Sequence, residues 1–66
     1  MDYFAVYRDV WEFHKKYIDD VSDADGFWEE AIAEADKLCR EHGNIRFVRD
    51  LILAEINEFE RIVREI

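Results

Sequence analysis

The chain has 66 residues, half of them hydrophobic, one cysteine and a formal net charge of −8. This length predicts one domain spanning residues 1–66, close to the lower limit for a fold held together by its core alone. One cysteine excludes an internal disulfide, and the acidic balance argues against direct nucleic-acid binding, which normally requires clustered lysine and arginine.

The first predicted helix covers residues 2–21, where apolar side chains recur at alternating steps of four and three. This period predicts an amphipathic helix with a wide buried stripe. The first row of the stripe is Tyr3, Tyr7, Val10, His14, Tyr17 and Val21, and the second is Phe4, Trp11 and Ile18. Aromatic residues make up 15% of the chain, a generous share for a small core, so we expect some to be left for a partner.

The second predicted helix covers residues 23–42. Ser22 followed by Asp25 has the spacing of a capping box, and Asp25 itself is the alternative N-cap. Gly43 and Asn44 are expected to end this helix, because both tolerate the left-handed backbone conformation. Its predicted inward positions are Trp28, Ala31 or Ile32, Ala35, Leu38 or Cys39, and His42.

The third predicted helix covers residues 45–65. Opposite charges four residues apart, such as Arg46 and Asp50, suit a solvated helical face. The predicted inward positions are Val48, Leu51, Ile52, Ile56, Phe59, Ile62 or Val63, and Ile66. Three helices of similar length joined by short connections predict an all-α fold, an antiparallel three-helix bundle.

The charge imbalance lies in one part of the chain, residues 19–36, which we call the acidic segment. Residues 1–18 carry three bases and three acids, and residues 37–66 carry six of each. The acidic segment has no lysine or arginine, and its eight acids are Asp19, Asp20, Asp23, Asp25, Glu29, Glu30, Glu34 and Asp36.

Two interpretations of the acidic segment stay open. It is either a solvated face that provides solubility, or a negative surface that mimics DNA phosphates or docks on a basic groove of another protein. Phe27 and Trp28 lie within the segment and are candidate aromatic anchors for such a partner.

The patterns that suggest metal binding are incomplete. Asp23-Ala24-Asp25-Gly26 is similar to the middle of an EF-hand loop, but the first and twelfth ligand positions would then be Val21 and Ile32, which cannot coordinate calcium. Cys39, His42 and His14 do not supply the four ligands, or three and a water, that zinc requires. We therefore predict no metal site and no cofactor.

Catalytic residues are not predicted either. Nucleophilic catalysis would require Cys39 or Ser22 beside a positioned base, and Ser22 has a ready role as a helix cap. The paired carboxylates would lie on the convex surface of short helices, where a desolvated pocket is difficult to build. We therefore expect a protein that is not an enzyme.

The location of the protein also follows as an expectation from the sequence. No run of about 18 uncharged apolar residues is present, so we expect no membrane span. The N-terminal residues lack a basic segment followed by an apolar run, so we expect no signal peptide. A single thiol without an export signal predicts the reducing cytoplasm.

Four strings carry a resemblance to a known group of proteins. They are Trp11-Glu12-Phe13-His14-Lys15-Lys16-Tyr17, Phe27-Trp28-Glu29-Glu30, Glu34-Ala35-Asp36-Lys37-Leu38 and Arg46-Phe47-Val48-Arg49-Asp50-Leu51-Ile52-Leu53-Ala54. Together they resemble short acidic helical proteins encoded in prophages and mobile elements of Gram-positive gut bacteria. The resemblance implies no catalytic residue or cofactor, and it implies a part in phage–host conflict, with expression in the host bacterial cytoplasm.

Two functional hypotheses follow. In the first, the protein is an inhibitor or adaptor that binds a host nucleic-acid-binding or defence protein, with the acidic segment against the basic surface of that protein. In the second, it is a self-associating structural module, a homodimer formed by surplus aromatic residues of the first helix and apolar rows of the third.

Overall fold

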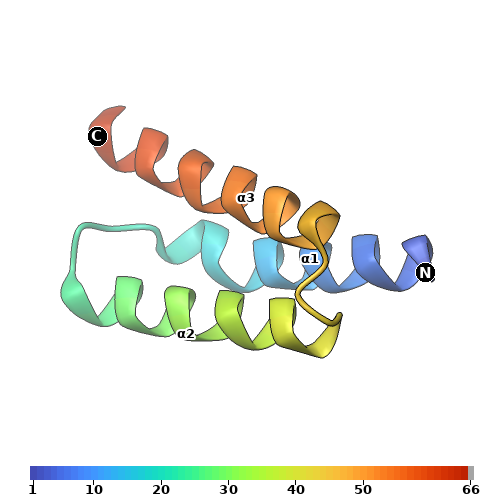
Figure 1. The fold of residues 1–66 in the computed structure, drawn as a ribbon. Helices are drawn as coiled ribbons and strands as arrows, with labels where there is room; N and C mark the ends of the chain where they lie inside the picture. Colours follow the sequence, from blue (N-terminus) through green and yellow to red (C-terminus); the bar gives the residue numbers. More distant parts are fainter. Residues whose placement is uncertain (66) are drawn as a thin grey trace.

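The computed structural model describes residues 1–65, so the predicted inward position Ile66 lies outside the described residues. Its elements are α1 (Tyr3–Tyr17), the short 3-10 helix η1 (Ile18–Asp20), α2 (Asp25–Glu41) and α3 (Arg46–Glu65). Consecutive α-helices run in opposite directions, and each α-helix contacts the other two (Figure 1). The predicted all-α three-helix bundle is confirmed.

Helix α1 begins where Asp2 caps it, because the Asp2 carboxylate accepts a hydrogen bond from the Ala5 N–H at 3.1 Å. It ends at Tyr17, after a last turn that contains Lys15 and Lys16, whose charges suit the C-terminal end of the dipole. The prediction that this helix continues to residue 21 is wrong, because the chain tightens into η1 and leaves the helix at Val21.

Helix α2 begins two residues later than predicted, and neither predicted cap is correct. The N-cap is Ala24, which has no capping side chain, and Asp25 is the first residue of the helix. The Ser22 hydroxyl instead accepts a hydrogen bond from the Ala24 N–H at 3.2 Å and so holds the turn before the helix. The negative charge of Asp25 still favours this end through the helix dipole.

The end of α2 was predicted correctly at Gly43 and Asn44. Both have positive φ, 74° and 56° respectively. The Asn44 N–H donates to the Cys39 carbonyl at 2.8 Å and the Gly43 N–H donates to the Arg40 carbonyl at 3.0 Å. These two bonds form a Schellman motif, which satisfies carbonyls that the helix end would otherwise leave unpaired.

The core runs along the axis of the bundle and is built mainly from aliphatic and small residues. Two alanines of α2, Ala31 and Ala35, are buried and let this helix approach its neighbours closely. Phe13 and Phe59 fill the space between the helices, with ring centroids 5.9 Å apart. The buried set is Val6, Val10, Phe13, Tyr17, Ala31, Ala35, Leu38, Val48, Ile52, Ile56 and Phe59.

The predicted inward positions agree best with the structure in α3 and least in α1. In α3 the predicted positions Val48, Ile52, Ile56 and Phe59 are buried. In α2 the buried alternatives are Ala31 and Leu38, whereas Ile32 is exposed. In α1 the prediction is wrong for the largest side chains, because the exposed residues of both predicted rows are Tyr3, Tyr7, Phe4 and Trp11.

Candidate functional site

The structure gathers six of the eight acids of the acidic segment at one end of the bundle. Asp19 and Asp20 belong to η1, Asp23 lies in the connection, and the others occupy the first two turns of α2. All six are exposed, and within residues 1–65 none forms an ion pair. We call this group the acidic end, and its members are Asp19, Asp20, Asp23, Asp25, Glu29 and Glu30.

The other two acids of the segment form ion pairs with basic side chains. Asp36 pairs with Arg40 one turn later, at 3.1 Å. Glu34 faces α1, where it accepts hydrogen bonds from the Lys16 ammonium at 2.7 Å and from the Tyr17 hydroxyl. These two bonds hold the pKa of Glu34 below its ordinary value. Burial and the same carboxylate raise the pKa of Tyr17.

The candidate aromatic anchors Phe27 and Trp28 are partly buried. Both pack against the core, and the Phe27 ring makes edge contacts with Tyr17, Phe59 and Trp28 at centroid distances of 5.9, 5.9 and 5.0 Å. Much of their aromatic surface is therefore used inside the fold. Exposed rings beside the acids would have favoured a binding role for these two residues, and the structure shows them partly buried.

Exposed aromatic residues lie instead on α1. Tyr3, Phe4, Tyr7 and Trp11 are 58, 74, 55 and 56% exposed. At 3.6 residues per turn these positions share one side of the helix. We call them the aromatic face, and exposed apolar groups that cluster in this way are typical of interaction surfaces.

Neighbouring side chains hold the aromatic face in place. The rings of Tyr3 and Tyr7 meet Phe47 of α3 edge-on, at centroid distances of 5.4 and 5.9 Å. Trp11 stacks on His14, with centroids 5.4 Å apart and ring planes 12° apart. Three of the four rings of the aromatic face therefore have defined neighbours within the fold.

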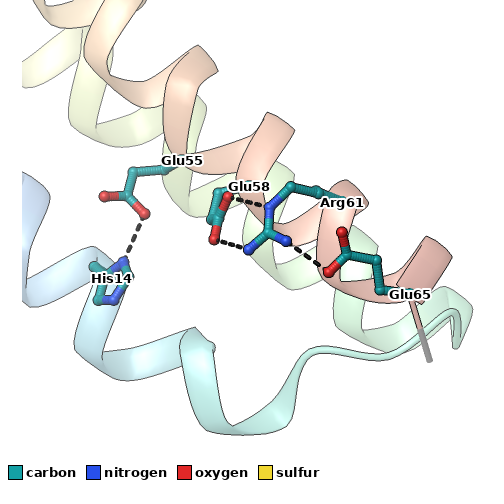
Figure 2. A network of polar contacts seen from close by, with 5 residues as sticks. All are labelled: His14, Glu55, Glu58, Arg61 and Glu65. Atoms are coloured by element: carbon teal, nitrogen blue, oxygen red, sulfur yellow. Dashed lines mark hydrogen bonds and ion pairs between the residues drawn. The ribbon is translucent and has the colours of Figure 1, made fainter.

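His14 is itself fixed by helix α3. Its Nδ1 lies 2.8 Å from a carboxylate oxygen of Glu55, in a partly buried contact between the two helices (Figure 2). Further along α3, Arg61 bridges Glu58 and Glu65 on the exposed surface, as Figure 2 also shows. The contact with Glu55 fixes the position of the His14 ring, against which Trp11 stacks.

The second histidine also ties α1 to a neighbouring helix. His42, directly after α2, places Nε2 2.7 Å from a carboxylate oxygen of Asp9. Partial burial raises the pKa of Asp9, but hydrogen bonds from His42 and Arg8 outweigh it, so this pKa lies below its ordinary value. Both histidines thus have structural partners on other helices.

Cys39 lies partly buried beside a shallow groove between α2 and α3. The groove, about 630 Å³, has an apolar floor that includes Ile52 and Ile56, and its exposed margin includes Ile32 and Leu53. Burial, together with the charge of Asp36, outweighs the opposing charge of Arg49 and raises the pKa of the Cys39 thiol. The thiol is therefore mainly protonated at neutral pH.

Sequence reasoning expected surplus aromatic residues on the first helix but did not identify them as the aromatic face, although a signal for it existed. Val6, Val10, Phe13 and Tyr17 are spaced by four, three and four residues, as regularly as the row that was predicted to be buried. The two rows share Val10 and Tyr17, and together they cover more of the helix surface than two neighbouring helices can bury. The buried row begins with the branched aliphatic Val6, whereas the predicted row begins with two tyrosines, and this difference indicated which row faces inward.

No family model, curated protein or solved structure matches the chain. Within residues 1–65, no three cysteine, histidine or acidic side chains come together in a metal-binding arrangement. None of the helices in this part of the chain has the length and apolar character needed to cross a membrane.

Proposed function

We propose that the chain is a small non-enzymatic protein-binding module that docks on a basic surface of another protein through the acidic end. The observation that carries this proposal is the gathering of six exposed carboxylates at one end of the bundle, without ion pairs inside residues 1–65. Uncompensated charge of one sign raises the rate of encounter with a surface of opposite sign and favours complementary partners.

The distribution of ion pairs supports this choice of surface. Elsewhere in the described chain most acids already have a basic partner, and the exceptions are Asp2, which caps α1, and the exposed Glu60. The net charge of −8 is therefore concentrated at the acidic end. A charge that served only solubility would not need to gather at one place.

The partner that fits this surface is a protein that ordinarily binds phosphates. Several carboxylates along η1, a connection and the first two turns of a helix present repeated negative charge, as a nucleic-acid backbone does. Together with the resemblance to prophage and mobile-element proteins, this favours an inhibitor of a host nucleic-acid-binding or defence protein, acting in the bacterial cytoplasm.

The test compares two variants of equal charge. In the first, Asp23→Asn, Asp25→Asn, Glu29→Gln and Glu30→Gln neutralise the acidic end. In the second, Glu12→Gln, Glu41→Gln, Asp50→Asn and Glu60→Gln neutralise exposed acids elsewhere. Each variant loses four negative charges, so the net charge changes from −8 to −4 in both.

Each variant and the unchanged chain are immobilised and used to capture proteins from a lysate of a Gram-positive host. We expect the unchanged chain and the second variant to retain the same basic protein, in a salt-sensitive manner. The first variant is expected to lose it while its circular-dichroism spectrum stays helical. Equal retention by the first variant, or equal loss in both, would contradict the proposal.

A further inference from the structure

The aromatic face has no role in the proposed function, because it lies on a different part of the molecule from the acidic end. The N-terminus of α1 lies at one end of the bundle and the connection between α1 and α2 at the other (Figure 1). The aromatic face occupies the first two-thirds of α1, whereas the acidic end begins after α1 has finished. A partner on one surface therefore leaves the other open.

We propose that the aromatic face binds a second copy of this chain, with the two α1 helices packed antiparallel about a twofold axis. The occupant is inferred from three observations: the area of the face, the spacing of its residues and the distribution of charge around it. The proposal does not depend on the acidic end.

The area of the face is close to what a weak dimer requires. Aromatic side chains carry roughly 150 to 250 Å² each, so four that are more than half exposed offer about 400 to 500 Å² per copy. The stems of Arg8 and Lys15 lie on the same side of the helix and add to the area. The total approaches the roughly 1,200 Å² at the lower limit of specific interfaces.

The spacing of the face matches an antiparallel pairing with itself. Phe4 and Trp11 lie at equal distances from a point between Tyr7 and Arg8. A twofold axis through this point places Phe4 of one copy opposite Trp11 of the other, at both ends of the contact. A twofold interface requires such a self-complementary surface.

The charges permit this pairing despite the net charge of −8. Residues 1–18, which include all of α1, carry three bases and three acids, so the contact region is balanced. In the antiparallel arrangement the two acidic ends point in opposite directions, more than about 30 Å apart at 1.5 Å per residue. This separation is several times the screening length of about 8 Å at physiological salt.

Nearby charges also argue against other occupants of the face. A nucleic acid or an anionic membrane would meet a molecule of net charge −8, and the bases on the side of α1 that carries the aromatic rings are Arg8 and Lys15. Both of these bases have an acidic partner on the same helix, Asp9 for Arg8 and Glu12 for Lys15. In the dimer the two Arg8 side chains lie beside the axis, but each is already paired with Asp9 of its own copy, so the contact carries little uncompensated charge.

The first test measures mass by sedimentation equilibrium over a hundredfold range of concentration. The mass of the unchanged protein is expected to rise from that of a monomer to that of a dimer as the concentration rises. Phe4→Glu, at a position 74% exposed, is expected to remain a single chain at every concentration. The matched control is Leu53→Glu, at an apolar position 57% exposed in the groove between α2 and α3, and it is expected to dimerise like the unchanged chain.

Several results of this test would overturn the proposal. They are a single chain at every concentration for the unchanged protein, growth beyond two chains, or dimers of Phe4→Glu as strong as those of the unchanged protein. Loss of dimers in Leu53→Glu, with its helical circular-dichroism signal intact, would place the contact elsewhere and would also overturn it.

The second test examines whether the two α1 helices pair in antiparallel or parallel direction, and it leaves the four aromatic residues unaltered. In a Cys39→Ser background, Arg8→Cys places a thiol next to the expected axis, whereas Lys15→Cys places one about 10 Å from it along the helix. Under mild oxidation we expect Arg8→Cys to form a disulfide-linked dimer and Lys15→Cys to stay monomeric. Efficient cross-linking by Lys15→Cys would indicate a parallel pairing, and no cross-linking by Arg8→Cys would indicate another surface; either would overturn the proposal.

Discussion

The two faces of α1 differ in the side chains they carry and in what covers them. The face toward the bundle carries Val6, Val10, Phe13 and Tyr17, each at most 8% exposed. The aromatic face carries residues of equal or larger size, each more than half exposed. Hydrophobic character alone therefore does not decide burial in a bundle this small, because the space between three helices accepts only one row from each.

The same substitution on both faces of α1 is expected to give the largest difference in stability. Phe13 is 3% exposed and Phe4 is 74% exposed on the same helix. Phe13→Ala leaves a cavity and is expected to lower the free energy of unfolding by about 3 to 5 kcal/mol, whereas Phe4→Ala is expected to change it by about 0.5 kcal/mol or less. Urea unfolding at low protein concentration measures both.

A loss of this size approaches the whole stability of a small domain, so Phe13→Ala is expected to unfold in part even without denaturant. Similar losses for the two variants would show that both rings lie in one core. In that case the separation of the two faces of α1 would be wrong.

A second matched pair of substitutions tests the hydroxyl groups of two tyrosines. Tyr17→Phe keeps the buried ring but removes the hydroxyl that donates to Glu34, so we expect a loss of about 1 kcal/mol. Tyr7→Phe removes a hydroxyl from a residue that is 55% exposed, and we expect no measurable change. Thermal unfolding followed by circular dichroism compares the two, and a larger loss in Tyr7→Phe would contradict the assignment of the faces.

A smaller effect is expected on the side of the buried row away from the aromatic face, where Asp9 contacts His42. Because the pKa of Asp9 is lower in the folded chain than in the unfolded chain, its carboxylate stabilises the fold above the unfolded pKa of about 3.9. This contribution is lost as pH falls through the lower folded pKa. Asp9→Asn should therefore lose stability at neutral pH and respond less to acid than the unchanged chain.

Unfolding free energies at a series of acidic pH values measure this difference. Glu34, whose pKa is also lowered in the folded chain, is unchanged in the Asp9→Asn variant, so part of the acid response remains. Identical pH profiles for the two proteins would show that the contact between Asp9 and His42 adds nothing to stability.

The sequence predicted the class of fold because periodicity and helix ends are local properties. Gly43 and Asn44 could be recognised as a helix end, since few other residues accept their backbone conformation. The core row of α3 could also be predicted, because only one of its sides is strongly apolar.

The inward row of α1 could not be predicted by periodicity, since two apolar rows of equal regularity compete. The choice between them depends on how closely α2 approaches, which Ala31 and Ala35 determine from another part of the chain. The acidic segment, in contrast, could be located from the sequence, but not the fact that Glu34 turns toward Lys16 and Tyr17. Contacts of this kind depend on the register between helices.

The environment of Trp11 tests the separation of the two faces most directly. In a Trp28→Phe variant Trp11 is the only tryptophan, and its fluorescence can be measured with acrylamide as a quencher in very dilute protein. A ring that is 56% exposed is expected to emit close to the wavelength of free tryptophan and to be quenched readily. Blue-shifted emission with weak quenching at the lowest concentration, in a single chain, would show that Trp11 is in the core and would contradict the account.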